Sequence, residues 1–204
     1  MRVRPHLEEL GFPLFTGDAP GESWARAAAC NAAARSAGSW EIALVADADT
    51  FLESDAVSRT IERVSRTRAA ARPHDHRWML NSASSKLFLA KGSKSLEPGR
   101  HLRGDAPGGG ALVVHREAFD EVGGYDERFV GWGYEDSAMN IELATTRRWE
   151  RMSGNSYHLS HVQPNILSTP AKANRALLEE LRAERARAIE RASRFAGYDL
   201  NAVL

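Results

Sequence analysis

Two acidic residues separated by one position follow a short apolar segment in the first half of the chain. Asp47 and Asp49 come directly after residues 42–46. Carboxylate oxygens are the ligands that hard divalent cations prefer, so two carboxylates at the end of a strand could hold a metal ion directly or through water. Solvent-exposed acids also produce this spacing by chance, and the pair alone leaves both interpretations open.

A pair of histidines could contribute to the same kind of site. His158 and His161 are three positions apart in the segment His-Leu-Ser-His. This spacing lets both imidazoles face one cation from a turn or an irregular strand, and neutral imidazole is a common metal ligand. A surface location without any metal is the competing interpretation.

The segment Gly131-Trp132-Gly133-Tyr134-Glu135-Asp136 combines an aromatic ring with two acids. A tryptophan between two glycines suits stacking on a sugar ring, because the backbone can approach closely on either side. Glu135 and Asp136 stand at the expected start of a helix, where acids interact favourably with the free N–H groups and the helix dipole. The same position would keep a carboxylate ionised, as a general base requires, so capping and catalysis both remain open.

The apolar pattern predicts the elements that would position these residues. Residues 42–46 form a continuous apolar run, which is typical of a parallel strand covered on both faces. Ligands of such sheets bind at the carboxyl ends of the strands, where Asp47 and Asp49 stand. Further strands are predicted at 12–15 and 111–115, and a loop rich in Gly, Lys, Ser and Pro at 91–110. Helices are predicted at 23–37, 54–70, 117–122, from about 135, and at 171–196.

Composition narrows the class of protein. The 204 residues fit one domain, and 27 basic residues balance 27 acidic ones, which argues against nucleic acid or an anionic membrane as partner. A single cysteine, Cys30, excludes an internal disulfide and fits a reducing compartment. No segment has the length and apolarity of a signal peptide or a membrane span. We therefore expect a cytoplasmic α/β protein.

In this order, the motifs resemble those of the metal-dependent β-1,4-galactosyltransferases and polypeptide GalNAc-transferases, which have the GT-A fold. The resemblance covers residues 23–161 and rests on five matching segments. These are Trp24-Ala-Arg26-Ala-Ala-Ala-Cys30-Asn31, Val45-Ala-Asp47-Ala-Asp49, Gly109-Gly110, Gly123-Gly124-Tyr125 and the 131–136 segment.

The resemblance implies a donor site. Trp24 and Arg26 would lie against the nucleotide, on the helix that carries Asn31, and Asp18 is the candidate to read the base. The Gly109-Gly110 pair would let the backbone approach the donor sugar, beside Asp47.

The resemblance also implies the groups that do the chemistry. Asp49 and His161 would bind manganese, and His158 replaces a ligating methionine, which should make the site more tolerant of magnesium. Trp132 would contact sugar, Glu135 would hold the acceptor, and Asp136 would be the base.

We therefore expect an α/β, GT-A-like domain at residues 1–170, with a mostly parallel sheet flanked by helices. Residues 171–204 would form a helix that packs on this domain or on a second subunit in a homodimer. Family members normally begin with a buried strand, and this sequence starts inside or after the helix that follows that strand. A missing strand should leave an apolar gap and exposed sheet edges. We therefore expect that another segment fills the gap, that the gene begins upstream, or that this is a shortened natural form.

The expected activity is transfer of a sugar from a nucleotide-diphosphate donor, most simply a UDP-sugar, with inversion at the anomeric carbon. The acceptor would be a hydroxyl of a glycan, protein or small molecule. Loop 91–110 could act as a lid that excludes water. One alternative is a degenerate GT-A protein that binds nucleotide or glycan without turnover. The other is a nucleotidyltransferase, which the sugar-stacking Trp132 beside a base argues against.

Overall fold

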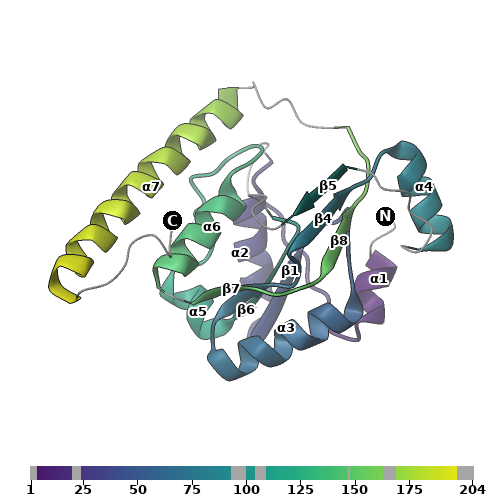
Figure 1. Cartoon of the computed structure of the whole chain (residues 1–204), viewed down its shortest axis with the longest axis horizontal. Coiled ribbons are helices and arrows are strands. Elements are labelled where there is room, and N and C mark those ends of the chain that lie inside the picture. Colours follow the sequence, from purple (N-terminus) through teal and green to yellow (C-terminus); the bar gives the residue numbers. More distant parts are fainter. Residues whose placement is uncertain are drawn as a thin grey trace. The chain divides into compact units, whose positions relative to one another are not determined.

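The computed structural model describes residues 4–19, 24–92, 100–103, 109–146, 148–162 and 169–196, with the backbone alone at 100–103 and 189–196. The chain divides into two compact units. The first comprises residues 1–14, 40–116 and 150–163, and the second comprises 15–39, 117–149 and 164–204. Among the described residues, no helix is long and apolar enough to cross a membrane. The predicted α/β class is confirmed, as mixed sheets and helices (Figure 1).

One sheet of the first unit has the strand order β1-β6-β3-β7. Its strands are β1 (Ile42–Ala46), β6 (Ala111–His115), β3 (Ala70–Arg72) and β7 (Trp149–Arg151). Helix α3 (Ser54–Thr67) covers this sheet, because its apolar stripe brings Val57 and Val64 against strand side chains such as Val113. The helix ends at Arg68, which adopts a left-handed conformation with φ 53°.

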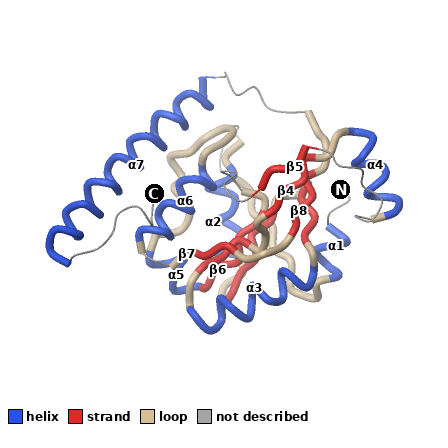
Figure 2. The backbone as a smooth tube through the Cα atoms, in the orientation of Figure 1, coloured by secondary structure: helices blue, strands red, loops and turns tan. Residues whose placement is uncertain are grey.

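The second sheet has the order β2-β8-β4-β5. It contains β2 (Thr50–Leu52), β8 (Asn155–His158), β4 (His76–Met79) and β5 (Arg100–Arg103). Strand β8 lies between β2 and β4, so the backbone of His158 is bonded into the sheet from both sides. Figure 2 shows these short strands in red.

Side chains alternate along strands, so the register gives the second sheet two different faces. Thr50 pairs with His158 and Phe51 with Tyr157, which places the members of each pair on a common face. The face that carries Phe51 and Tyr157 also carries Trp78, and these rings pack with Phe88 of helix α4 (Ser82–Lys91). The opposite face, which carries Thr50 and His158, is the polar one.

Two helices complete the first unit. Helix α1 (Arg4–Glu9) lies beside β2, since the His6 ring is 5.0 Å from the Phe51 ring and Nε2 of His6 accepts a hydrogen bond from the Leu52 N–H. Helix α4 begins at the N-cap Asn81, whose side chain accepts from the Ser84 N–H at 2.8 Å. It ends at Gly92, where φ is 76°.

The second unit is built from helices α2 (Arg26–Ser36), α5 (Arg116–Glu121), α6 (Glu135–Thr145) and α7 (Thr169–Ala196). Helix α7 packs along α6 (Figure 1), where Leu178 and Leu181 form an apolar cluster with Phe129 and Ala138. The sequence predicts that Leu177, Leu178, Leu181 and Ile189 form the apolar side of this helix, and the Ile189 side chain lies outside the described part of α7. The expected domain boundary at residue 170 and the homodimer stay predictions.

Three details of the predicted elements are wrong. Residues 12–15 form no strand, and Phe12, Leu14 and Phe15 are exposed by 53%, 40% and 48%. The sheet pairing is mainly antiparallel: β1–β6, β2–β8, β3–β6 and β4–β5 are antiparallel and β4–β8 is parallel. The predicted loop at 91–110 contains strand β5, and residues 93–99 and 104–108, on which the lid prediction falls, lie outside the described residues.

Candidate active site

A tight turn between β1 and β2 carries the two acids at the strand end. The Asp47 N–H donates to the Gly110 carbonyl at 3.0 Å, and the Thr50 N–H donates to the Asp47 carbonyl at 3.1 Å. The Leu159 N–H donates to the Asp49 carbonyl at 2.9 Å, which continues the β2–β8 pairing by one residue. The backbone therefore fixes Asp49 directly beside the end of β8.

Both histidines converge on the Asp49 carboxylate within the first unit. Nε2 of His158 lies 3.5 Å from Oδ1 of Asp49, and Nε2 of His161 lies 3.1 Å from Oδ2. One ligand atom from each of the three residues lies within 4.8 Å of the others. One carboxylate and two imidazoles form a donor set that suits Mn²⁺ and other first-row divalent cations. We refer to Asp49, His158 and His161 as the metal triad.

The surroundings of the metal triad favour neutral imidazole. Burial is the largest effect and lowers the pKa of His158, helped by the positive charge of Arg77 and opposed by Asp49. A neutral ring is the form that binds metal. His161 is more exposed, and its Nδ1 lies 2.8 Å from the Val162 carbonyl, which leaves Nε2 facing Asp49.

The glycine pair lies beside this turn. Gly110 has φ 102°, a conformation that glycine adopts readily and that strains any other residue. Nη1 of Arg77 donates to the Gly109 carbonyl at 3.3 Å. Asp47 is half-buried, bonds to Gly110 through its backbone, and lies close enough to raise the pKa of His158 by its charge. The structure thus brings Asp47, the glycine pair and the metal triad together.

The second unit contains its own group of charged residues at the start of α6. Nη1 of Arg26 lies 2.5 Å from Oδ1 of Asp136 and 3.6 Å from Oε1 of Glu135. The Glu135 side chain is 7% exposed and that of Asp136 19%. The Arg26 guanidinium also lies over the Tyr125 ring, 5.7 Å from its centroid. One cation therefore balances two largely buried acids.

The loop before α6 has an unusual backbone. Gly131, Gly133 and Tyr134 all have positive φ, at 81°, 96° and 77°. For a tyrosine this conformation is strained, by about 1–3 kcal/mol. The Asn174 amide of α7 supports the loop by donating to the Val130, Trp132 and Gly133 carbonyls at 3.0–3.3 Å. The Trp132 ring is half-buried at this loop.

Three other predicted donor-site residues lie in the second unit. Trp24 is 56% exposed, and its carbonyl accepts from the Gly131 N–H at 2.7 Å. Asp18 is exposed, and it follows Gly17, where an added Cβ atom would clash with the Ala29 carbonyl of α2. Asn31 is buried, and its amide bonds to both backbone groups of Tyr125 and to the Glu127 carboxylate. These bonds give Asn31 a structural role in the described chain.

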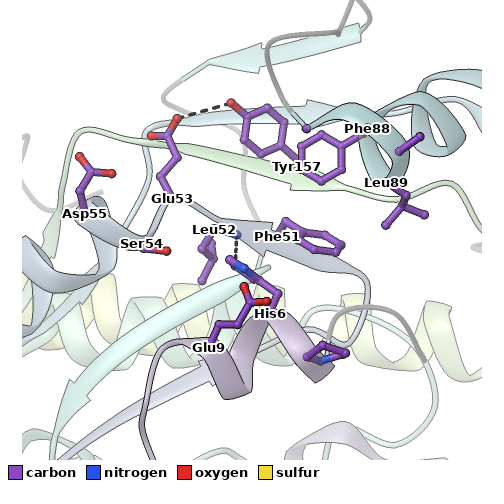
Figure 3. A pocket seen from close by; sticks show the side chains of 13 residues that line it. His6, Glu9, Phe51, Leu52, Glu53, Ser54, Asp55, Phe88, Leu89 and Tyr157 are labelled. Atoms are coloured by element: carbon purple, nitrogen blue, oxygen red, sulfur yellow. Dashed lines mark hydrogen bonds between the residues drawn. The ribbon is translucent and has the colours of Figure 1, made fainter.

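Sequence reasoning missed a hollow of about 780 Å³ on the aromatic side of the second sheet, between α1 and α4 (Figure 3). Its walls include the rings of Phe51, Phe88 and Tyr157, with His6 on one side. Glu53 lies at the rim and binds the Asn155 N–H and side chain and the Tyr157 hydroxyl. The rings also form the apolar core of this face, which accounts for their position without a ligand.

Two further residues of the site regions were missed because their signal is weak. Arg77 looks in the sequence like any charged residue of a strand, and Asn174 looks like a polar residue within a long helix. Their importance comes from contacts with Gly109 and with the 130–133 loop, which are distant in the sequence. Periodicity reports the local element and cannot reveal such partners.

Comparison with known proteins gives two matches. Residues 92–162 match the family model described as the N-terminal domain of galactosyltransferase. The chain is also 33% identical over 91 residues to a probable N-acetylgalactosaminyltransferase 9 of Caenorhabditis elegans. That alignment covers 42% of this chain and 14% of the relative, so the chain spans a small part of the relative's length. The family match includes Gly109, Gly110, the 131–136 segment and both histidines of the metal triad.

Proposed function

We propose that this chain, a GT-A galactosyltransferase-like protein, is a glycosyltransferase that moves a sugar from a nucleoside-diphosphate donor to an acceptor hydroxyl. The observation that carries the proposal is the convergence of Asp49, His158 and His161 on one point. This convergence lies beside the Gly109-Gly110 pair, in a chain whose residues 92–162 match a galactosyltransferase model.

The metal triad would hold Mn²⁺ or Mg²⁺ against the donor diphosphate, where the cation would stabilise the charge of the leaving group. Asp49 contributes the anionic ligand and both imidazoles contribute neutral ones. The backbone bond from the Leu159 N–H to the Asp49 carbonyl holds the backbone of Asp49 beside the end of β8, which carries His158.

Asp136 is the residue that we assign as general base. The acceptor oxygen would form a bond to the anomeric carbon while the bond from that carbon to the diphosphate oxygen breaks. The hydroxyl proton would pass to the Asp136 carboxylate, and the bonding electrons would leave with the diphosphate. Attack from the face opposite the leaving group inverts the anomeric configuration.

We assign Arg26 the role of a cationic partner to both carboxylates during this proton transfer. It contacts Asp136 and Glu135 together, so it keeps a charged partner when Asp136 becomes protonated. Glu135 would orient the acceptor, and Trp132 would stack on a sugar ring. Of possible donors, UDP-sugars come first, and the name of the matched relative suggests UDP-N-acetylgalactosamine as the first to try.

The test is a thermal-shift screen of nucleotide sugars with and without Mn²⁺, followed by an assay of donor hydrolysis and transfer. A ligand that binds the folded state raises the melting temperature. We expect a shift that needs both Mn²⁺ and donor, and that is lost in Asp49→Asn. A donor that binds and is neither hydrolysed nor transferred would identify the degenerate binding protein instead. Absence of any metal-dependent shift would contradict both.

A further inference from the structure

A buried histidine next to the glycine pair has no hydrogen-bond partner among the described residues. His74 follows β3 in the connection to β4 and is 1% exposed. Both of its ring nitrogens are buried and make no hydrogen bond within the described chain. Leaving such groups unsatisfied costs about 1–3 kcal/mol each. A buried donor and acceptor that make no hydrogen bond with the described residues are available to a bound group.

Arg77 lies beside His74 and also has a buried hydrogen-bond donor without a partner among the described residues. Its Nη1 donates to the Gly109 carbonyl, whereas its Nε is buried and makes no hydrogen bond with described residues. A Cβ atom added to Gly110 would lie 3.6 Å from Cζ of Arg77, 3.7 Å from Cε1 of His74 and 3.7 Å from Cγ2 of Thr50. The three side chains therefore meet beneath the α-carbon of Gly110.

This cluster adjoins the metal triad. The Thr50 hydroxyl lies 3.4 Å from Oδ1 of Asp49, and the Gly110 carbonyl accepts from the Asp47 N–H. Arg77 and His158 lie on the same face of neighbouring strands, because Arg77 pairs with Ser156 and His158 is two residues further along β8. Arg77 is half-buried, so part of its side chain reaches solvent.

The charge of the cluster favours an anion. Burial and then the charges of Arg72 and Arg77 lower the pKa of His74 to about 3, against the opposing charge of Asp75. His74 is thus a neutral hydrogen-bonding group in a cationic environment. A guanidinium with a free edge, beside a neutral N–H and a divalent-cation site, suits phosphate oxygens.

We propose that Arg77 and His74 bind a phosphate group of the donor beside the metal triad, Arg77 through its charged guanidinium and His74 through its ring N–H. The identity of the ligand as a donor diphosphate rests on the proposed function. The binding chemistry itself rests on the unused donors beneath Gly110. Arg77 is then a specificity residue for diphosphate, and His74 supplies the second hydrogen bond.

The test measures binding of inorganic pyrophosphate by calorimetry, with Mn²⁺ present, in the parent chain and in Arg77→Gln, Arg77→Lys and His74→Leu. We expect Arg77→Gln to weaken pyrophosphate binding about 10-fold to 100-fold, and Arg77→Lys to weaken it less because the charge is kept. His74→Leu should weaken it about 3-fold to 10-fold. The matched control is Arg66→Gln, which removes an exposed arginine from α3 of the same unit and should leave the affinity unchanged.

A second measurement separates binding from folding. Replacing the unsatisfied imidazole by leucine should keep or raise the melting temperature at neutral pH, so weaker pyrophosphate binding in a fully folded His74→Leu supports the ligand role. Pyrophosphate affinity equal to the parent in folded Arg77→Gln would overturn the proposal.

If Arg77 proves essential for pyrophosphate but no sugar is transferred, the proposed function fails and the phosphate site stands. If sugar is transferred but pyrophosphate affinity does not depend on Arg77, the proposed function stands and the phosphate site fails.

Discussion

The guanidinium of Arg26 lies 2.5 Å from the carboxylate of Asp136, although 110 positions separate the two residues in the chain. The same guanidinium lies 3.6 Å from Glu135. The ion pair thus fixes the orientation of the assigned base and connects the start of α2 to the start of α6.

Asp136→Asn should abolish most of the turnover, because asparagine keeps the shape of the side chain but cannot take a proton. Removal of a general base typically lowers the rate about 10²-fold to 10⁴-fold. We expect donor and Mn²⁺ affinities to hold, as measured by calorimetry. Asp120→Asn, at an exposed acid of the same unit, serves as control. Transfer by Asp136→Asn at the parent rate, or a product that retains the donor's configuration, would show that this assignment is wrong.

Arg26→Ala should reduce stability as well as function. From sequence alone, the change is expected to weaken donor binding with stability nearly unchanged, whereas the structure shows that Arg26 balances two largely buried carboxylates. Removing the guanidinium from two largely buried carboxylates should cost about 1–3 kcal/mol or more in urea unfolding. The comparison is Arg128→Ala, which removes an exposed arginine from its pair with the half-buried Asp126 and should cost about 0–1 kcal/mol. Equal stabilities of the two variants would argue against the ion pair in solution.

Single substitutions in the metal triad should each weaken Mn²⁺ binding. His161→Gln removes the more exposed imidazole and should lower the Mn²⁺ affinity with little effect on the melting temperature of the apo protein. Asp49→Asn should lower it more, since the anionic ligand is lost. Titration calorimetry checks both, with Asp55→Asn as an exposed control on α3. Affinities that match the parent in both variants would exclude this site.

His74 makes the free energy of unfolding sensitive to acid. The folded-state pKa of about 3 is below the ordinary value of 6.5, so between these values the unfolded chain binds a proton that the folded chain does not. The stabilisation by neutral His74 is therefore complete above pH 6.5 and is lost as the pH falls through this window, by about 1.4 kcal/mol per pH unit. Urea unfolding at pH 7.5 and 5.5 measures the loss, and His74→Leu should remove this share of it. A pH dependence in His74→Leu identical to that of the parent would count against a buried neutral imidazole.

Asn174→Ala should loosen the segment that carries Trp132. Asn174 is 3% exposed, and its amide donates to three carbonyls of the 130–133 loop, in which Gly131 and Gly133 have positive φ. Loss of this donor should destabilise the chain by about 1–3 kcal/mol. Hydrogen exchange of the loop amides should rise, and Lys172→Ala on the exposed side of α7 is the control. Unchanged exchange in Asn174→Ala would mean that other contacts hold the loop.

The sequence predicted best where local pattern and geometry coincide. The apolar run at residues 42–46 is a strand and ends at the acids as expected. Asp49 precedes β2, and the two histidines lie at and just after the end of β8, which pairs with β2. The prediction from residue type alone, that these three residues form one group, therefore agrees with the structure. The helix start at Glu135 followed from its acidic first turn.

The remaining features depend on partners that are distant in the chain. Residues 12–15 have the apolar composition of a strand, but no described strand pairs with them and their side chains stay exposed. Strand direction was misjudged because a fully apolar run indicates burial on both faces and does not report the neighbour, which for β1 is antiparallel β6. The ion pair of Arg26 and the amide bonds of Asn174 could not be predicted either. Each joins two segments that are far apart in the sequence, and local periodicity describes one segment at a time.

Because the two faces of β8 have different roles, a one-residue insertion or deletion in this strand should be unusually damaging. Tyr157 belongs to the aromatic core and His158 to the metal triad, yet they are consecutive residues. Loss or gain of a single residue within β8 would turn the side chains of the later β8 residues to the opposite face of the sheet. The His158 imidazole would then point into the aromatic cluster, and the Tyr157 ring would point toward Asp49. One in-frame deletion would therefore damage folding and metal binding together. Insertions and deletions should therefore be tolerated only outside residues 155–158. Substitutions within these residues should be tolerated where they keep the alternation of side chains between the two faces.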